Sequence, residues 1–183
     1  GSRELAGLEF GFQYRGPKWP IGQFTLRGEA TNNLRRDEKI TTAGTEISAL
    51  GKDGATKWRA NTTLTWSRNA WSAGWFIDYY GSFASTGATT TKVIYDALGQ
   101  PDSIKPINNS GITSYYLNVD PFVSHSAYVA YRFERAEQSW LRGVNVRIGV
   151  GNVFDAEPSA AAVASAYQVG TADPRGRQFS LEL

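Results

Sequence analysis

The chain has 183 residues, of which 41% are hydrophobic and 13% aromatic, and its formal net charge at pH 7 is +2. No apolar run approaches the ~18 residues that a membrane-spanning helix needs, so a helical membrane protein is excluded. Absence of cysteine excludes a disulfide framework and a thiolate metal site, and the scattered lysines and arginines argue against a nucleic-acid partner.

The first half of the sequence predicts four strands, because apolar and polar residues alternate with period two. These strands are residues 5–15, 22–31, 58–67 and 71–80. Glycine and two prolines at 16–20 predict a short turn between the first two strands, and residues 67–70 a tight turn between the last two. The polar segment 32–57 between the two pairs is expected to be a long surface loop. No signal peptide is visible, since the sequence begins directly with a strand pattern, and we expect a mature piece or an internal fragment.

The second half predicts three more strands and repeats the alternation of short and long connections. Residues 81–114 fit no regular element and are expected to be a second long loop. A less regular strand over 116–133, with Pro121 near its start, is followed by a short charged turn at 134–140. The last two strands are 144–151 and 176–183, with a third long loop between them. Alternation of short and long connections is typical of outer-membrane β-barrels, in which short turns face the periplasm and long loops face outward. On this pattern we expect the three short turns to face the periplasm and the three long loops to face outward.

Two sequence boxes flank the third long loop. The first is Asn-Val-Phe-Asp-Ala-Glu-Pro and the second begins Gly-Arg-Gln-Phe, each next to a strand of correct alternation. In this order and spacing they resemble the C-terminal end of TonB-dependent outer-membrane receptors. The matching residues are Asn152, Phe154, Asp155, Pro158, Gly176, Arg177 and Phe179. That family usually ends a few residues later in an aromatic residue, whereas this sequence stops at Leu183, so we expect the true terminus to be missing.

The resemblance implies a bacterial outer-membrane protein that takes up a scarce nutrient, such as a ferric siderophore, without a cofactor. Its fold would be all-β: a transmembrane antiparallel β-barrel of 22 strands, of which residues 1–183 form the C-terminal segment of about seven. The implied partners are outer-membrane lipid, the plug domain and remaining barrel strands, the TonB complex and a small-molecule ligand. Neither a plug nor a TonB box is recognisable here, so these parts are expected elsewhere.

The alternation also predicts which way side chains point. Apolar faces are expected to contact lipid, and polar faces to line the lumen, where Arg27, Arg59 and Arg147 would pair with the plug or attract an anionic ligand. An open sheet in lipid leaves edge N–H and C=O groups unpaired at several kcal/mol each. We therefore expect the last strand to pair with 144–151 on one side and with a strand outside this sequence on the other.

No catalytic constellation is present in the sequence, and an enzyme is not expected. His125 is the only histidine, and its place in an alternating strand favours a structural role over metal binding. The isolated carboxylates have no positioned base or nucleophile, and the glycines at 51 and 54 belong to a turn rather than to a phosphate-binding loop.

Aromatic residues near the second long loop are the candidate ligand contacts. Tyr80, Phe83, Tyr115 and Tyr116 are expected at the mouth of the lumen, where aromatic rings can stack on a ligand, whereas Tyr79 points outward by its alternation. Alternating strands with polar loops also describe a soluble all-β carbohydrate-binding module, which is the second functional class considered. A folded, monodisperse protein in buffer without detergent would favour that module.

Overall fold

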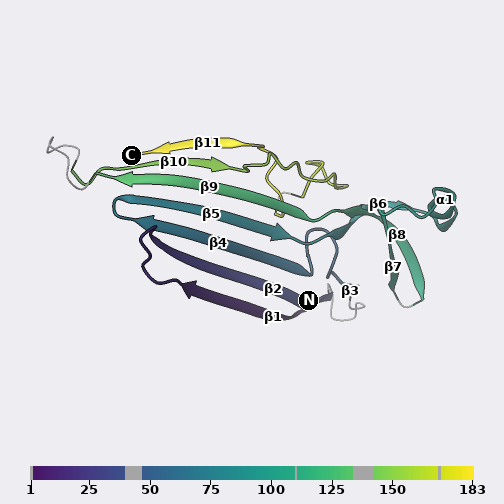
Figure 1. Cartoon of the computed structure of the whole chain (residues 1–183). Helices are drawn as coiled ribbons and strands as arrows, with labels where there is room; N and C mark the ends of the chain where they lie inside the picture. The colour runs from purple at the N-terminus through teal and green to yellow at the C-terminus, as the bar shows by residue number, and fades with distance from the viewer. Residues whose placement is uncertain (1, 40–46, 110, 134–141, 169) are drawn as a thin grey trace.

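The structure is a computed structural model that describes residues 2–39, 47–109, 111–133, 142–168 and 170–183. Within these residues the chain is all-β, with one short helix (Figure 1). The elements are β1 (Ser2–Arg15), β2 (Gln23–Lys39), β3 (Ile47–Ser48), β4 (Trp58–Arg68), β5 (Trp71–Tyr80), β6 (Phe83–Thr90), α1 (Lys92–Ala97), β7 (Ile104–Asn109), β8 (Ile112–Val119), β9 (Phe122–Arg132), β10 (Asn145–Gly151) and β11 (Gln178–Glu182).

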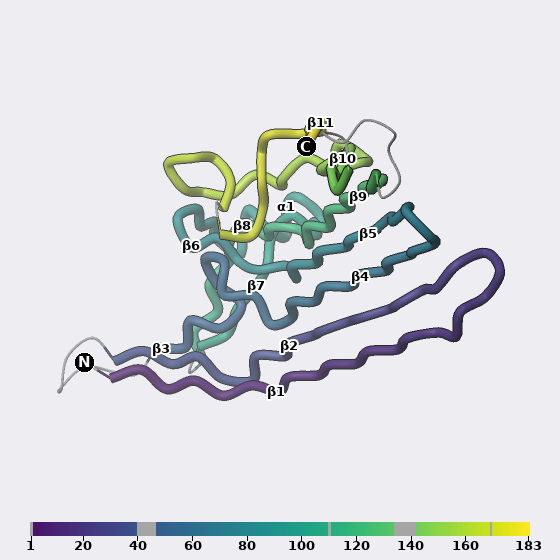
Figure 2. The backbone as a smooth tube through the Cα atoms, turned by 90° about the vertical axis from the view of Figure 1, so that its left-hand side faces the viewer, coloured from purple at the N-terminus to yellow at the C-terminus, as the bar shows by residue number. Residues whose placement is uncertain are grey.

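The main sheet contains the seven predicted strands, paired antiparallel in the order β1-β2-β4-β5-β9-β10-β11. Chain neighbours therefore lie side by side throughout, except that β9 pairs with β5 across the excursion formed by β6, α1, β7 and β8. The predicted pairing of the last strand with 144–151 is confirmed, with Phe179 opposite Val150. β1 and β11 lie at opposite edges and are not paired with each other, so the described residues form an open sheet (Figure 2).

One face of this sheet is apolar across all seven strands. Directly paired residues share a face because successive side chains alternate. One row of paired residues crosses the whole sheet and contains Tyr14, Leu26, Leu64, Trp75, Ala127, Val150 and Phe179. Three of these side chains are exposed, Tyr14 at 59%, Leu64 at 42% and Phe179 at 76%, and the other four are half-buried.

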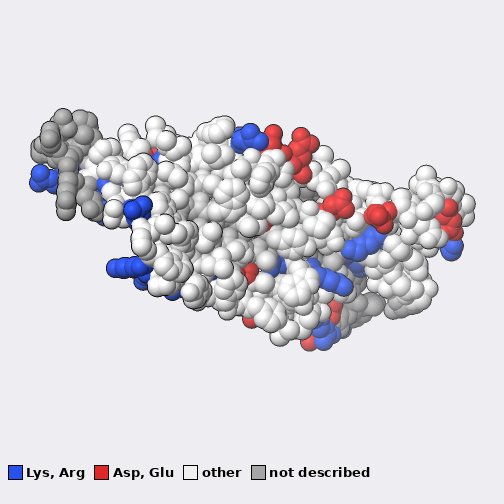
Figure 3. Space-filling model, viewed as in Figure 1, with Lys and Arg blue, Asp and Glu red and all other residues white. Residues whose placement is uncertain are grey.

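The opposite face is polar, and it carries the three arginines expected there. Arg27 lies in a row with Gln13 and Thr63, and Arg59 in a row with Thr31 and Tyr80. Arg147 is opposite Ala130 and Glu182. On the face of the molecule seen in Figure 3, charged side chains are sparse over the middle of the sheet and gather toward its ends.

Long and short connections are sorted to opposite ends of the strands, as the sequence predicts (Figure 1). The β1–β2 and β4–β5 turns lie at one end, which we call the turn end; Asn69 adopts a left-handed φ of 51° in the second of them. The β2–β4, β5–β9 and β10–β11 connections lie at the other, the loop end. The predicted charged turn at 134–140 lies outside the described residues.

The long connections are more ordered than the sequence suggests, and three expectations are wrong. Residues 32–57 are not all loop, because β2 continues to Lys39 and β3 pairs with it. Residues 81–114 hold β6, α1, β7 and the start of β8, and the three strands make a second sheet in the order β6-β8-β7. The single strand expected over 116–133 is two strands, β8 and β9, because the ladder ends before Pro121, whose nitrogen cannot donate a hydrogen bond.

Most of the buried side chains lie in the loop-end connections rather than on the sheet faces. Phe83 is 1% exposed and packs with Val119 and Ala161. Ala84, Ser85 and Thr56 are fully covered. The connections that converge here come from separate parts of the chain, and the segment near residue 161 lies beside β6 (Figure 2). No described helix is both long and apolar enough to cross a membrane.

Candidate ligand-binding site

Arg59 is the centre of the site at the loop end of the polar face. Its Nε donates to Thr56 Oγ1 at 3.4 Å and its Nη2 to the Gly54 carbonyl at 3.3 Å. The guanidinium carbon lies 5.3 Å from the centre of the Tyr80 ring, one strand away. A guanidinium over an aromatic face gains a favourable electrostatic contact. These three contacts fix the position of the Arg59 guanidinium, and because the residue is exposed its remaining N–H groups stay accessible to a ligand.

The turn that supplies Thr56 is fixed by backbone geometry and by β6. Asp53 and Gly54 adopt left-handed φ values of 44° and 83°, a region that Asp tolerates and Gly occupies without strain. The Asp53 N–H donates to the Ala84 carbonyl, and the Asp53 carboxylate accepts from both the N–H and the hydroxyl of Thr86. The turn is thus attached to a strand roughly thirty positions away in sequence, which explains why Gly54, Ala55 and Thr56 are buried although Asp53 is exposed.

β2 forms the other support of this turn. Asn33 donates its backbone N–H to the Lys57 carbonyl at 2.8 Å and its side-chain Nδ2 to the Thr56 carbonyl at 2.9 Å. The two bonds attach the turn to the strand that lies between β1 and β4, so the Arg59 site is held from both sides.

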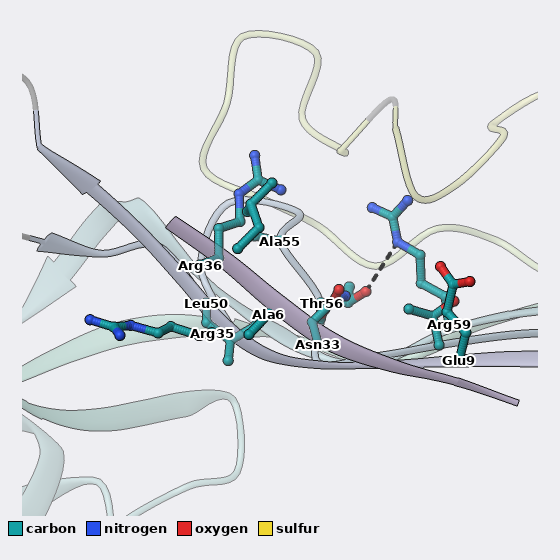
Figure 4. Close-up of a pocket in the computed structure, with 12 residues that line it drawn as sticks. Ala6, Glu9, Asn33, Arg35, Arg36, Leu50, Ala55, Thr56 and Arg59 are labelled. Carbon is teal, nitrogen blue, oxygen red and sulfur yellow. Dashed lines mark hydrogen bonds between the residues drawn. The ribbon is translucent and has the colours of Figure 1, made fainter. Parts of the chain in front are cut away.

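A cavity of about 620 Å³ lies between this turn and the ends of β1 and β2. Arg36 and Arg59 reach from it to the same side of the strands, whereas Arg35 extends in another direction (Figure 4). Arg35 is paired with Glu4 at 2.8 Å and with Asp37. The Arg36 Nε forms an ion pair with Glu38 Oε1 at 3.7 Å, a separation longer than a hydrogen bond. Glu9 also lines the cavity, but Arg36 and Arg59 together leave an excess of positive charge, which favours an anionic occupant with carboxylate-like or phosphate-like oxygens.

The four aromatic residues expected to contact a ligand do not gather at one site, although Tyr80 and Phe83 line one small hollow. Tyr80 stands beside Arg59 on the polar face. Phe83 is 1% exposed, so its ring supports the loops and has almost no surface left for a ligand. Tyr115 and Tyr116 lie on β8 in the smaller sheet, where Tyr115 packs against Tyr95 of α1 with ring centres 4.9 Å apart.

The other two predicted lumen arginines have partners within the chain. Arg27 Nη2 donates to Gln13 Oε1 at 2.8 Å. Arg147 lies 4.0 Å over the Tyr128 ring and 3.6 Å from Glu182. Their position on the polar face follows the expected alternation, and their pairing with a plug stays a prediction.

The two sequence boxes meet at one junction between β10 and β11. Asn152 closes the first box, because its Oδ1 accepts from the Ala156 N–H at 2.8 Å and its Nδ2 donates to the Ala156 carbonyl at 2.9 Å. Asp155 then reaches across to the second box, where its Oδ1 accepts the Arg177 N–H at 2.7 Å. A Cβ on Gly176, which has a φ of 63°, would lie 2.9 Å from that oxygen. The glycine is therefore needed both for its conformation and for the space it leaves.

Phe154 and His125 belong to the apolar face. The Phe154 ring lies 4.9 Å from the His125 ring and 6.1 Å from Trp75, and Trp75 Nε1 donates to His125 Nδ1 at 3.2 Å. This arrangement satisfies the imidazole with an aromatic donor and matches the structural role expected for it. Among the residues that the structure describes, no group of three or more His, Asp or Glu side chains is placed to hold a metal ion.

Sequence reasoning missed Arg36, Thr56 and Gly54, which complete the surroundings of Arg59. All three lie in residues 32–57, which were expected to be a long surface loop and were not considered as ligand contacts. The available signal was the glycine pair at 51 and 54 directly before a strand, since such a turn can present backbone carbonyls to the first strand residues.

Comparison with known proteins gives no match: no family model, no curated protein and no solved structure is similar to this chain at the level of significance required.

Proposed function

We propose that this chain forms part of the transmembrane β-barrel of a TonB-dependent outer-membrane receptor that takes up a scarce anionic nutrient, such as a ferric siderophore. The observation that carries the proposal is the apolar face that runs unbroken across seven antiparallel strands. Soluble monomers rarely expose contiguous apolar patches larger than a few hundred Å². Lipid is the environment in which such a face is stable, and the polar face then lines a lumen.

The two sequence boxes add independent support. Their residues bond to each other through Asp155 and Arg177, so their order and spacing have a structural cause in this chain. Strand pairing adds a further argument, since β1 and β11 each present an unpaired edge within the described sheet. In lipid these edges must pair with further strands, as they do in a closed barrel of 22 strands.

The ligand is proposed from the polar face. Arg36 and Arg59 supply positive charge at the loop end, where an incoming molecule would first enter the lumen, and Tyr80 supplies an aromatic surface. Carboxylate or catecholate groups of a metal chelate suit both features. Arg27 and Arg147 lie deeper along the strands and are proposed to contact the plug. The chain performs no catalysis in this proposal, because the TonB complex acts on the plug and the barrel is the static wall.

Cell fractionation and uptake test the proposal. The whole protein that contains this chain is expected in the bacterial outer membrane, extractable only with detergent. It is expected to support growth on one scarce nutrient in a TonB-dependent manner. Arg59→Ala should weaken binding of that nutrient while Arg15→Ala, on the same face at the turn end, should not. A protein that is folded and monodisperse in buffer without detergent, and that binds a sugar, would instead support the carbohydrate-binding module.

A further inference from the structure

A second cavity, of about 460 Å³, lies at the loop end next to β4, β5 and β7. Trp58 and Tyr79 contribute to its wall, and both belong to the apolar face of the sheet. Tyr79 is paired with Ala60 and Val123, in the row that also contains Phe10. Trp58 is paired with Asn32 and stacks on Phe10, with ring centres 6.4 Å apart. This cavity therefore adjoins the apolar face, whereas the Arg59 cavity adjoins the polar one.

Two lysines line the same cavity, Lys57 immediately before β4 and Lys105 on β7. The pKa of Lys105 is lowered, first because its amine is partly buried and second because the Lys57 charge repels a second proton. No ion pair or hydrogen bond to an acidic side chain is found for either amine within the described part of the chain. Two close, uncompensated cations favour an anion between them.

The position of the cavity decides which kind of anion is available. Trp and Tyr at the end of an apolar band mark the level where hydrocarbon meets water, since each ring has an apolar body and a polar N–H or O–H. Trp58 is 43% exposed at this level. Lysines at this level keep their ammonium groups in the headgroup layer. At that depth the abundant anion is the phosphate of a lipid headgroup, and acyl chains can lie along Phe10 and Trp58.

We propose that Lys57 and Lys105, with Trp58 and Tyr79, bind the phosphate headgroup of a lipid in the outer leaflet of the membrane around the barrel. The inference rests on the proposed function, because it takes the apolar face to be the lipid-facing one. It goes beyond that function, since the site is on the outside of the wall and serves no part of nutrient uptake. Bound lipid would attach β7 to β4, two elements from different sheets.

The test uses the whole protein in a non-ionic detergent, with phosphatidic acid as the probe and phosphatidylcholine, whose phosphate charge is balanced by choline, as the comparison of zero net charge. Bound lipid is counted by native mass spectrometry. The variant is Lys57→Gln with Lys105→Gln. The matched control is Lys18→Gln with Lys92→Gln, which removes the same charge at the β1–β2 turn and on α1. Both double variants are first checked to be folded, by showing that they remain folded on heating as the unmodified protein does.

Each lysine near a membrane surface contributes about 1 kcal/mol, which is about fivefold in affinity. The double variant at the cavity is therefore expected to bind phosphatidic acid about thirtyfold more weakly than the unmodified protein. The control and the unmodified protein should bind it equally and prefer it to phosphatidylcholine, and inorganic phosphate should not compete. Equal binding by both double variants would overturn the proposal. Full competition by inorganic phosphate would also overturn it, because the site would then take a soluble anion. A protein that is folded and monodisperse without detergent would instead contradict the proposed function itself, so the two outcomes can be told apart.

Discussion

The assignment of the two sheet faces makes a sharp prediction for an arginine placed on either side of β4. Leu64 lies in the apolar row between Leu26 and Trp75 and is 42% exposed. Asn61 lies in a polar row between Glu29 and Asp78, and its Nδ2 is 3.5 Å from the Glu29 carboxylate. Leu64→Arg therefore places a charge in lipid, whereas Asn61→Arg places it between two carboxylates.

The two substitutions should differ clearly in how much they lower the free energy of unfolding. An arginine on the lipid face costs about 2–4 kcal/mol at the bilayer midplane and less toward either interface. Leu64 lies nearer to Trp66 at the turn end than to Trp58 at the loop end, so the lower value of about 2 kcal/mol applies to Leu64→Arg. Asn61→Arg should change the free energy of unfolding by less than about 0.5 kcal/mol, because exposed ion pairs contribute little. The ratio of folded to unfolded protein at equal denaturant should then differ by about ten- to thirtyfold between the two variants.

Urea unfolding of the whole protein in lipid vesicles, followed by tryptophan fluorescence, measures this difference. Thr63 is a poorer comparison than Asn61, since an arginine there would lie directly opposite Arg27. Equal destabilisation by the two variants, or a larger effect of Asn61→Arg, would refute the assignment of the apolar face to lipid.

Three other predictions concern the connections. Asp155→Ala should lower the free energy of unfolding by roughly 1–2 kcal/mol, because it removes the acceptor of the Arg177 N–H and leaves alanine at a φ of 55°. Asp155→Asn should lose less stability, so the melting temperature in detergent should be highest for the unmodified protein, lower for Asp155→Asn and lowest for Asp155→Ala. Phe83→Ala should lower the local free energy of unfolding by about 3–5 kcal/mol, and amide hydrogen exchange should become faster in residues 83–86 but not in β4. Leu98→Ala, at an exposed position, should leave both the stability and the exchange rates unchanged. Protease added to intact cells should cut first near α1, which has no buried residue, and an initial cut at Thr56 would contradict the packing described here.

The strands of the main sheet could be predicted because one apolar face imposes a period of two on every strand. That pattern is local, so it can be seen in the sequence without knowledge of the partners. Pairing also follows, since neighbours joined by short turns are antiparallel. The break at Asp120 was missed because Pro121 can also occupy the edge or first position of a strand.

The order within the long connections could not be predicted, because it depends on contacts between distant segments. Ser85 accepts the N–H of Ala162, and Asp53 is bonded to Thr86. Polar residues that bond to distant partners look the same in a sequence as those that bond to water. Arg59 and Tyr80 were correctly placed on one face by alternation, whereas Phe83 was misjudged because an aromatic ring near a loop gives no sign of being buried.

The packing of the loop-end connections gives the Arg59 cavity walls of unequal stiffness. One wall, with Ala55 and Thr56, is fixed to β6 through the hydrogen bonds of the 51–54 turn, and displacing it would break those bonds to Ala84 and Thr86. The facing wall is the start of β1, an edge strand held within the described sheet by β2 alone. The wall next to Arg59 is therefore the stiffer one in the described sheet, and a strand that pairs with the free edge of β1 in a closed barrel would set how far the facing wall can move.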